Sequence, residues 1–388
     1  MKMRLGDIAD FINGDRGKNY PSQSDIVPFG DVPFVNAGHL DGRSIRLDEM
    51  NYISQEKYEK LNSGKFVKGD ILYCLRGSLG KKAVIKDDIY GAIASSLVII
   101  RPDTNRVDVD YLMFALDSPS IQEQLVRANN GSSQPNLSAS SVHAYEIDLP
   151  GKELQIEISE RLSKVRSIID ARNEEMALLD DLIKARFVEM FGDPMINNKG
   201  YQLKQYGELF ELNAGGTPSK AHPEYWEGGT IPWIGSNMCQ NEYIYKNDGH
   251  FITEEGLAHS SAKVFPIDTV LVALVGATVG KTALLKFETT TNQNVLGIRG
   301  IRESGYSPEF VYYYTQGLYK KFLGLTDGGF AMASKGFISE LPIPLVNLGD
   351  QESFTQFANQ IDESKSVIQK SLDETQLLFD SLMQKYFG

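Results

Sequence analysis

The residues most suggestive of chemistry are Gly280-Lys281-Thr282, which come directly after an apolar run. They could bind a nucleoside triphosphate, because a phosphate loop places Gly-Lys-Thr after a strand and wraps the phosphates in backbone N–H groups. That loop needs a glycine five positions before Gly280, where the chain has Val275. Gly276 is present instead, so the loop is one residue too short. A P-loop-like nucleotide hydrolase is therefore kept as an alternative hypothesis only.

Few other residues could carry chemistry. The five histidines are scattered, with no His-Glu-x-x-His motif and no pair at metal-ligand spacing. Cys74 and Cys239 have no Cys or His two to four residues away, so we expect buried free thiols rather than a zinc site or a disulfide. A Gly-x-Ser-x-Gly nucleophile motif is also missing. We therefore predict no catalytic residue, no metal site and no cofactor in this chain.

Composition indicates an ordinary globular protein. The chain has 388 residues, of which 41% are hydrophobic and 23% charged, which suggests about two to three domains. The first residues contain no apolar core of signal-peptide length, and no apolar run approaches the roughly 18 to 20 residues that span a bilayer. We expect a cytoplasmic protein.

The chain repeats once, at a spacing of 199 to 200 residues. Val32-Pro33-Phe34-Val35 recurs as Ile231-Pro232-Trp233-Ile234, and residues 77–83 recur as residues 277–283. The apparent nucleotide motif therefore belongs to a duplicated unit. After Lys82 the first copy continues as a short segment that ends in two acids, where a phosphate loop would begin a long helix. We predict a strand, a tight glycine turn and a second strand, with a lysine at the hairpin tip.

Each copy ends in a long helical pattern. In residues 153–191 apolar side chains alternate at steps of four and three, and residues 354–382 have the same ladder. This spacing is typical of a coiled-coil seam, and two seams in one chain can pair with each other. The alternative is that each helix packs only on its own globular unit. Gly192 and Pro194 end the first helix.

The globular parts mix short strands with one or two helices. Strands are expected at residues 71–75, 93–101, 270–275 and 295–301, and helices at residues 108–126 and 308–323. We therefore predict an α+β fold. The expected boundaries are a first globular domain at 1–150, a first helix at 151–195, a second globular domain at 196–349 and a second helix at 350–388.

Several motifs together resemble one family. They are Gly215-Gly216-Thr217-Pro218-Ser219, Tyr225-Trp226, Ile231-Pro232-Trp233, Gly276-Ala277-Thr278-Val279-Gly280-Lys281, Thr291-Asn292-Gln293 and Leu341-Pro342-Ile343-Pro344. This set resembles the target-recognition domain of type I restriction-modification specificity (S) subunits, and residues 1–150 are similar to a more distant copy. The turn after Pro344 departs from the family pattern, since of its Glu-Gln only Gln351 is kept.

The resemblance implies a non-catalytic subunit with two target-recognition domains separated by two long antiparallel coiled-coil helices. Each domain would read one half of a bipartite double-stranded DNA site. The helices would act as a spacer and bind two modification (methyltransferase) subunits, and the assembly would recruit two restriction subunits. S-adenosylmethionine, ATP and Mg would then belong to the partner subunits. For partner binding we expect the seam residues Leu162, Ile169, Met176, Ile183, Ile361, Ile368, Leu372 and Leu382.

The net charge of −12 is unusual for a DNA-binding protein. Residues 1–150 nevertheless hold 17 basic and 20 acidic residues, and residues 196–349 hold 12 and 14, so the two recognition domains are nearly neutral. Binding depends on local phosphate contacts rather than on net charge. We expect the isolated chain to bind DNA weakly.

Base reading requires amides and cations that match base edges. Candidates lie in polar loops flanked by glycine, although such loops can also be simple turns. In the first domain they are Arg16, Lys18, Asn19, Tyr20, Arg76, Lys81, Lys82, Asn130, Ser132, Ser133 and Gln134. In the second they are Thr217, Ser219, Lys220, Asn237, Asn241, Thr278, Lys281, Asn292, Gln293 and Lys335. A further alternative is a coiled-coil adaptor that reads no bases.

Overall fold

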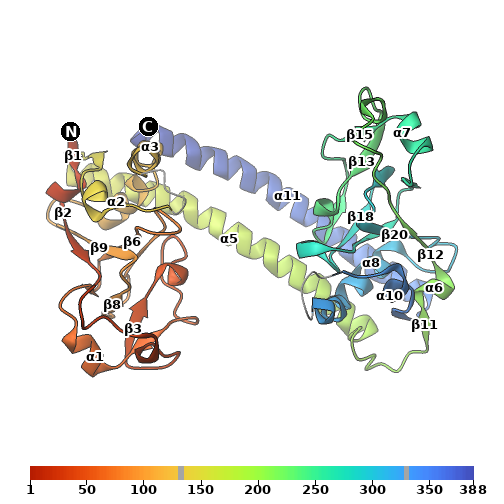
Figure 1. Ribbon diagram of the computed structural model, residues 1–388, viewed down its shortest axis with the longest axis horizontal. Coiled ribbons are helices and arrows are strands. Elements are labelled where there is room, and N and C mark those ends of the chain that lie inside the picture. The colour runs from red at the N-terminus through yellow and green to blue at the C-terminus, as the bar shows by residue number, and fades with distance from the viewer. Residues whose placement is uncertain (130–134, 327–331) are drawn as a thin grey trace. The chain divides into compact units, whose positions relative to one another are not determined.

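The computed structural model describes residues 1–129, 135–326 and 332–388. The chain forms two compact units (Figure 1). Unit 1 comprises Met1–Asn173 together with Lys370–Gly388, and unit 2 comprises Glu174–Gln369. Among the described residues, no helix is both long and apolar enough to cross a lipid bilayer.

The described residues of unit 1 form three small sheets. One four-stranded sheet is antiparallel, in the order β2 (Ala9–Asn13), β9 (Leu97–Pro102), β6 (Ile71–Cys74), β7 (Lys82–Val84). The second has the order β4 (Tyr52–Ile53), β3 (Val32–Val35), β8 (Gly91–Ile93), β5 (Lys65–Phe66), with β3 and β8 parallel. The third pairs β1 (Lys2–Arg4) with β10 (Glu146–Asp148). The strand expected over residues 93–101 is therefore wrong, because a turn divides this stretch between two sheets.

The helices of unit 1 are α1 (Gln55–Lys60), α2 (Val109–Ala115), α3 (Pro119–Ala128) and α4 (Ala139–His143), besides parts of two long helices. The single helix expected at residues 108–126 is thus two. Ser118 has an extended backbone, its side chain accepts a hydrogen bond from the N–H of Ile121, and Pro119 is the next residue. Proline suits the first turn of a new helix but not the interior of an old one, so α2 and α3 are separate.

Unit 2 repeats this architecture. Its main sheet has the order β12 (Glu211–Ala214), β20 (Val295–Arg299), β17 (Val270–Ala273), β18 (Thr282–Leu285), β14 (Glu242–Ile244). A second sheet has the order β15 (Phe251–Ile252), β13 (Ile231–Ile234), β19 (Thr289–Thr291), β16 (Val264–Phe265), again with a central parallel pair. The strands β11 (Leu203–Gln205) and β21 (Pro342–Pro344) form the third. The α+β class and the repeat are confirmed.

The short helices of unit 2 are α6 (Tyr206–Leu209), α7 (Glu254–Ala258), α8 (Pro308–Gly317), α9 (Tyr319–Leu323) and α10 (Lys335–Ser339). The helix expected at residues 308–323 is again divided, here at Leu318. The helix α8 begins as α3 does, with a serine whose side chain accepts a backbone hydrogen bond and a proline in the first turn.

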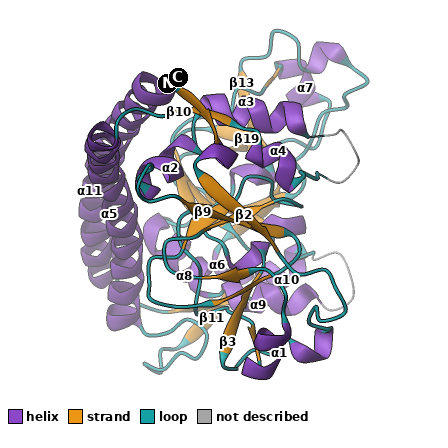
Figure 2. Ribbon diagram, turned by 90° about the vertical axis from the view of Figure 1, so that its left-hand side faces the viewer, coloured by secondary structure: helices purple, strands orange, loops and turns teal. Residues whose placement is uncertain are grey.

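Two long helices, α5 (Lys152–Phe191) and α11 (Leu348–Phe387), each contribute residues to both units. In unit 1, Arg161 donates a hydrogen bond to the Tyr386 hydroxyl at 3.2 Å, and Arg172 donates to the carbonyl of Ser371 at 2.8 Å. The residue numbers of the contacts in α11 fall as those in α5 rise, so the helices are antiparallel in this unit. Figure 2 shows the two helices side by side.

The same holds in unit 2. Lys365 donates to Asp180 at 2.6 Å, and the rings of Phe187 and Phe354 lie 5.1 Å apart in an edge-to-face contact. The sequence expectation of an antiparallel helix pair is therefore confirmed within each unit.

Three residues expected to bind a partner are instead part of the chain's own cores. Leu162, Ile169 and Ile183 are at most 4% exposed. The first two belong to the core of unit 1 and the third to that of unit 2. The heptad pattern was recognised correctly. At these three positions, however, the chain's own side chains cover the seam, so a partner subunit cannot contact them. The other five seam residues, Met176, Ile361, Ile368, Leu372 and Leu382, are half-buried.

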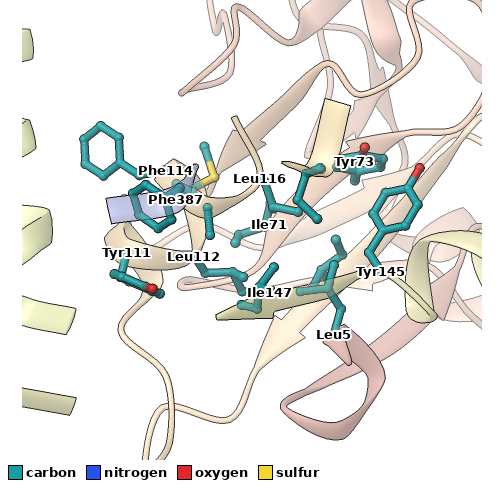
Figure 3. Close-up of a cluster of buried hydrophobic side chains, with 14 of the residues drawn as sticks. Leu5, Ile71, Tyr73, Tyr111, Leu112, Phe114, Leu116, Tyr145, Ile147 and Phe387 are labelled. Atoms are coloured by element: carbon teal, nitrogen blue, oxygen red, sulfur yellow. The ribbon is translucent and has the colours of Figure 1, made fainter. Parts of the chain in front are cut away.

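The cores are continuous with the long helices. In unit 1, Phe114 of α2 packs with Phe379 of α11. Tyr111 of α2 packs with Phe387 of α11, and Figure 3 shows this pair beside Phe114. In unit 2, Phe310 of α8 contacts Phe187 and Phe191 of α5. Aromatic contacts therefore hold the long helices against the globular part of each unit. In each unit the loops are connected to this packed core.

A buried glutamine ties each long helix to its unit in the same way. Gln155 of α5 donates to the carbonyls of Arg106 and Pro150 and accepts from the N–H of Asp108. Gln351 of α11 donates to the carbonyls of Gly305 and Val346 and accepts from the N–H of Ser307. Both side chains are fully buried.

Candidate nucleic-acid interface

The duplicated motif forms a β-hairpin in both units. In unit 2, Val270 pairs with Leu284 and Val272 with Thr282, and the connecting turn contains a short 3₁₀ helix, Gly276–Thr278. The residues after Lys281 continue as strand β18 rather than as a helix. The hairpin prediction is confirmed, and this geometry is not that of a phosphate loop.

The lysine at the hairpin tip of unit 2 is held by a neighbouring loop. Lys281 donates to Oε1 of Gln240 at 2.6 Å, and Oδ1 of Asn241 accepts from the N–H of Thr282 at 3.0 Å. Gly280 has a φ of 77°, and a side chain there would lie 2.5 Å from Phe322. Only glycine therefore permits this turn, which fixes the direction from which Lys281 emerges.

Amide and hydroxyl side chains continue from this point over the same loops. Gln240 also donates to the carbonyl of Asn237, and the hydroxyl of Thr217 donates to Oε1 of Gln293 at 2.6 Å. A carbon atom built on Gly235 would lie close to both Asn237 and Asn292, so these two amides are neighbours. The structure thus brings Thr217, Asn237, Asn292, Gln293 and Lys281 of the predicted set into one surface, which we call the amide surface.

The other predicted residues of unit 2 lie outside the amide surface. Thr278 is part of the hairpin turn, where its hydroxyl donates to the carbonyl of Val275. Ser219, Lys220 and Lys335 are exposed. Within the described part of the chain, no hydrogen bond links these three side chains to the amide surface.

The hairpin of unit 1 presents one of its two lysines. Lys81 donates to the carbonyl of Ala37 at 3.3 Å, in the turn after β3. Lys82 is only 3% exposed and forms an ion pair with Asp117 inside unit 1. Because successive residues of a strand point to opposite faces, Lys81 and Lys82 cannot both face outward. The expectation that Lys82 contacts DNA is therefore wrong.

The loop after β2 carries a second predicted group. Arg16 and Lys18 are exposed. Arg16 donates to the carbonyl of Ser95 at 3.4 Å, and the hydroxyl of Tyr20 accepts from the N–H of the same residue at 3.4 Å. Asn19 donates to the carbonyl of Lys60 at 2.8 Å, which commits its amide group to the fold. The two cations are the members of this loop that remain available to a ligand.

Asp15 shapes this loop, although the sequence did not single it out. Its carboxylate accepts from the N–H of Gly17 at 2.7 Å and from that of Asn62 at 2.8 Å. These two hydrogen bonds hold the pKa of Asp15 below its ordinary value. A charged Asp15 therefore orders the residues beside Arg16 and Lys18.

His39 is a second residue that the sequence did not reveal. Its Nδ1 accepts from the N–H of Asn36 at 3.1 Å, while the Asn36 side chain accepts from the N–H of Gly38. These bonds shape the turn to which Lys81 donates. Burial lowers the pKa of His39 below its ordinary value, and the positive charge of Arg46 adds to this effect. The signal available in the sequence was the Asn-x-x-His spacing, which suits a helical cap.

Part of the predicted set cannot be placed. Asn130, Ser132, Ser133 and Gln134 lie outside the described residues. Arg76 is exposed at the hairpin tip of unit 1, and its backbone forms an isolated bridge with Asn136. In unit 2 the equivalent bridge joins Val275 to Met332.

The resulting surfaces combine fixed cations with amide and hydroxyl groups. Cations can bind phosphate, and amides can form paired hydrogen bonds with base edges. Among the described residues, no cluster of three or more His, Cys, Asp or Glu side chains is arranged to hold a metal ion. These side chains are suited to binding a polar, anionic ligand.

Comparison with known proteins identifies the family. The model described as "Type I restriction modification DNA specificity domain" matches residues 1–179 and 198–375. The chain belongs to this family. Each match covers one set of sheets and more than half of the long helix that follows it in the sequence. The family model is therefore matched twice, as the fold is duplicated.

Curated relatives are specificity subunits of type I restriction enzymes. The chain is 25% identical to the EcoR124I/EcoR124II specificity subunit of Escherichia coli, over 58% of this chain and 56% of that protein. It is 30% identical to the MjaIX subunit of Methanocaldococcus jannaschii, over 47% and 43%, and 20% identical to the HindI subunit of Haemophilus influenzae, over 79% and 82%. The chain thus spans about half the length of the first two relatives.

Solved structures share the fold. The S subunit of a type I restriction-modification system from M. genitalium has a TM-score of 0.60 at 17% identity, covering 100% of this chain and 96% of that one. A chain from a study of the assembly and conformational transition of the type I R-M system has a TM-score of 0.57 at 18% identity, covering 100% and 97%. These likenesses support the architecture described above.

Proposed function

We propose that the chain is the DNA-recognition subunit of a type I restriction-modification complex and that each unit reads one half of a bipartite site. The observation that carries this proposal is the duplicated hairpin. In each unit a tip lysine, Lys81 or Lys281, is hydrogen-bonded to the loop after the central parallel strand, β3 or β13. Two copies of one recognition device suit a target with two halves.

In this proposal Lys281, Lys81, Arg16 and Lys18 bind phosphates, and the amide surface of unit 2 reads base edges. The chain carries out no catalysis. Methylation, ATP hydrolysis and cleavage belong to partner subunits, together with S-adenosylmethionine, ATP and Mg. The stoichiometry of two methyltransferase and two restriction subunits is part of the same proposal.

Methylation mapping of DNA modified by the assembled complex tests the proposal. Two short half-sites separated by a fixed spacer are expected, and a single contiguous motif would contradict it. Replacing residues 196–349 by the corresponding domain of a relative should change one half-site only. If both half-sites stay the same after that exchange, the chain is a coiled-coil adaptor that reads no bases.

The long helices serve as the spacer in this proposal. Removing seven residues from α5 and the paired seven from α11 shortens the helix pair by about 10 Å, since each helical residue rises about 1.5 Å. With about 3.4 Å per base pair, the spacer in the methylated site should shorten by about three base pairs. A functional variant with an unchanged spacer would exclude the spacer role.

We also propose that methyltransferase subunits bind the outer faces of these helices. Because the seam is filled from within, the available apolar side chains are exposed ones such as Leu178 and Leu182 of α5 and Val367 of α11, which are 61%, 46% and 70% exposed. Leu178→Glu should weaken co-purification with the methyltransferase subunit, whereas Glu175→Ala on the same helix should not. Equal recovery with both variants would place the contact elsewhere.

A further inference from the structure

Unit 2 contains a cavity of about 640 Å³ between its helix pair and its main sheet. It is lined by residues of α5, α11, α8 and the strand β14, all of them within 174–369. The volume lies in the range of small-molecule sites, which are about 300 to 1,000 Å³. The chain therefore has room there for a ligand the size of a short alkyl chain with polar ends.

One wall of the cavity is aromatic. The rings of Tyr243 and Tyr312 are 5.2 Å apart in an edge-to-face contact, and Tyr313 lies 4.8 Å from Tyr312. Aromatic faces attract cations through their negative quadrupole. The ammonium group of Lys286 already lies 5.1 Å from the centre of the Tyr243 ring, so this set of rings accepts a positive charge.

The lining of the cavity also carries negative charge that nearby lysines do not balance. Lys184 pairs with Asp181, and Lys365 pairs with Asp180 at 2.6 Å. Lys365 is 3.9 Å from one oxygen of Asp362. The other oxygen of Asp362 is buried, and among the residues that the structure describes it has no hydrogen-bond partner.

A buried carboxylate oxygen without a partner is costly, because it has lost water and gained no hydrogen bond in exchange. Burial raises the pKa of the Asp362 carboxyl above its ordinary value. Glu242, a second lining carboxylate, forms no ion pair with any described residue. The lining is therefore short of positive charge.

We infer that this cavity binds a small organic cation, a guanidinium or alkylammonium group on an aliphatic chain. The charged end pairs with Asp362, and its chain lies along the tyrosine rings. Neutral and anionic ligands of the same size bind more weakly, since they bring no positive charge to the carboxylate. Gln240, which accepts the hydrogen bond from Lys281, also lines the cavity, so an occupant borders the amide surface.

Titration of the full chain with agmatine and with spermidine, measured by calorimetry, tests this inference without DNA or partner subunits. One saturable site is expected for at least one of these cations, and none for 1,4-butanediol or glutarate. Absence of binding by both cations at concentrations up to about 10 mM, where even millimolar sites would fill, would overturn the inference. Its failure would leave the proposed recognition function untouched.

Two variants of α11 locate the site. Asp362→Asn should weaken cation binding at least about tenfold, because it removes the partner charge, while Glu363→Gln, an equal change in net charge outside the cavity, should alter it less than about twofold. Protection of Cys239 from a thiol reagent verifies that unit 2 stays folded in both. Equal binding by wild type and Asp362→Asn would show that the cation binds elsewhere and would overturn the assignment.

Discussion

Replacing Phe379 by alanine should destabilise unit 1 more than unit 2. Phe379 lies near the end of α11 yet is 5% exposed in the core of unit 1. Its ring is 6.2 Å from that of Phe114, and the guanidinium of Arg166 lies 4.3 Å from its centre. Truncation of a buried phenylalanine typically costs about 3 to 5 kcal/mol, because it removes apolar contacts and leaves a cavity.

The two free cysteines make the measurement specific. Cys74 and Cys239 are fully buried, the first in unit 1 and the second in unit 2. Labelling of each thiol at increasing urea concentration, resolved by mass spectrometry of tryptic peptides, monitors each unit separately. With a urea dependence of about 2 to 3 kcal/mol per molar for a unit of this size, the midpoint for Cys74 should fall by about 1 to 2.5 M.

The control for this test is an exposed residue of the same helix. Leu378→Ala removes a neighbouring apolar side chain that is 52% exposed, and it should shift the midpoint for Cys74 by less than a quarter of the Phe379→Ala effect. If Phe379→Ala leaves the labelling of Cys74 unchanged, α11 does not complete the core of unit 1. If it shifts Cys74 and Cys239 equally, the two units unfold as one, and the division into units has no energetic meaning.

Three further predictions rest on particular contacts. Lys281→Gln in the assembled complex should weaken DNA binding and reduce the magnitude of the slope of log affinity against log salt by about one. Lys246→Gln, at an exposed lysine, should change neither the affinity nor the slope. Equal effects of the two substitutions would show that only net charge matters. The pKa of His39 lies below its ordinary value near 6.5, so the unfolded chain binds the proton more tightly and stability falls as the pH drops from about 6.5 through the folded value. The protection factor of the Asn36 amide, which allows for the slower intrinsic exchange at low pH, should then fall, and unchanged protection at pH 5 would contradict this. Gln351→Ala leaves a buried N–H and two carbonyls without their partner and should destabilise unit 2 by about 2 to 4 kcal/mol; thiol labelling of Cys239 measures the loss, and Glu352→Ala is the matched control.

The sequence predicted features that depend on local pattern. The hairpin was predictable because its two copies share Gly80 and Gly280 but continue with different residues. A strand suits both continuations, whereas a long helix does not. The helix pair was predictable from its heptads. The divided helix at Ser118-Pro119 was missed although serine before proline is a helix start signal, because the apolar spacing continues across it.

Features that depend on tertiary contacts were not predictable in the same way. Lys81 and Lys82 are residues of the same type, and only the direction of each side chain relative to the sheet decides which one is buried. The repeat gave one indication, since Lys82 aligns with Thr282, which is also buried. Asp15 and His39 act through backbone hydrogen bonds, for which spacing gives little signal. The unpaired oxygen of Asp362 arises only when α11 and β14 are brought together.

The discontinuous make-up of unit 1 has a consequence for how the chain is made. Residues 174–369 leave the ribosome as one uninterrupted stretch, so unit 2 has all its own residues before unit 1 does. Unit 1 is begun first but waits for residues 370–388, which supply Phe379, Met383 and Phe387 to its core. During that interval the nascent chain exposes the apolar side chains of α5 that share this core, such as Leu162 and Ile169, and this segment is where a chaperone would be needed most.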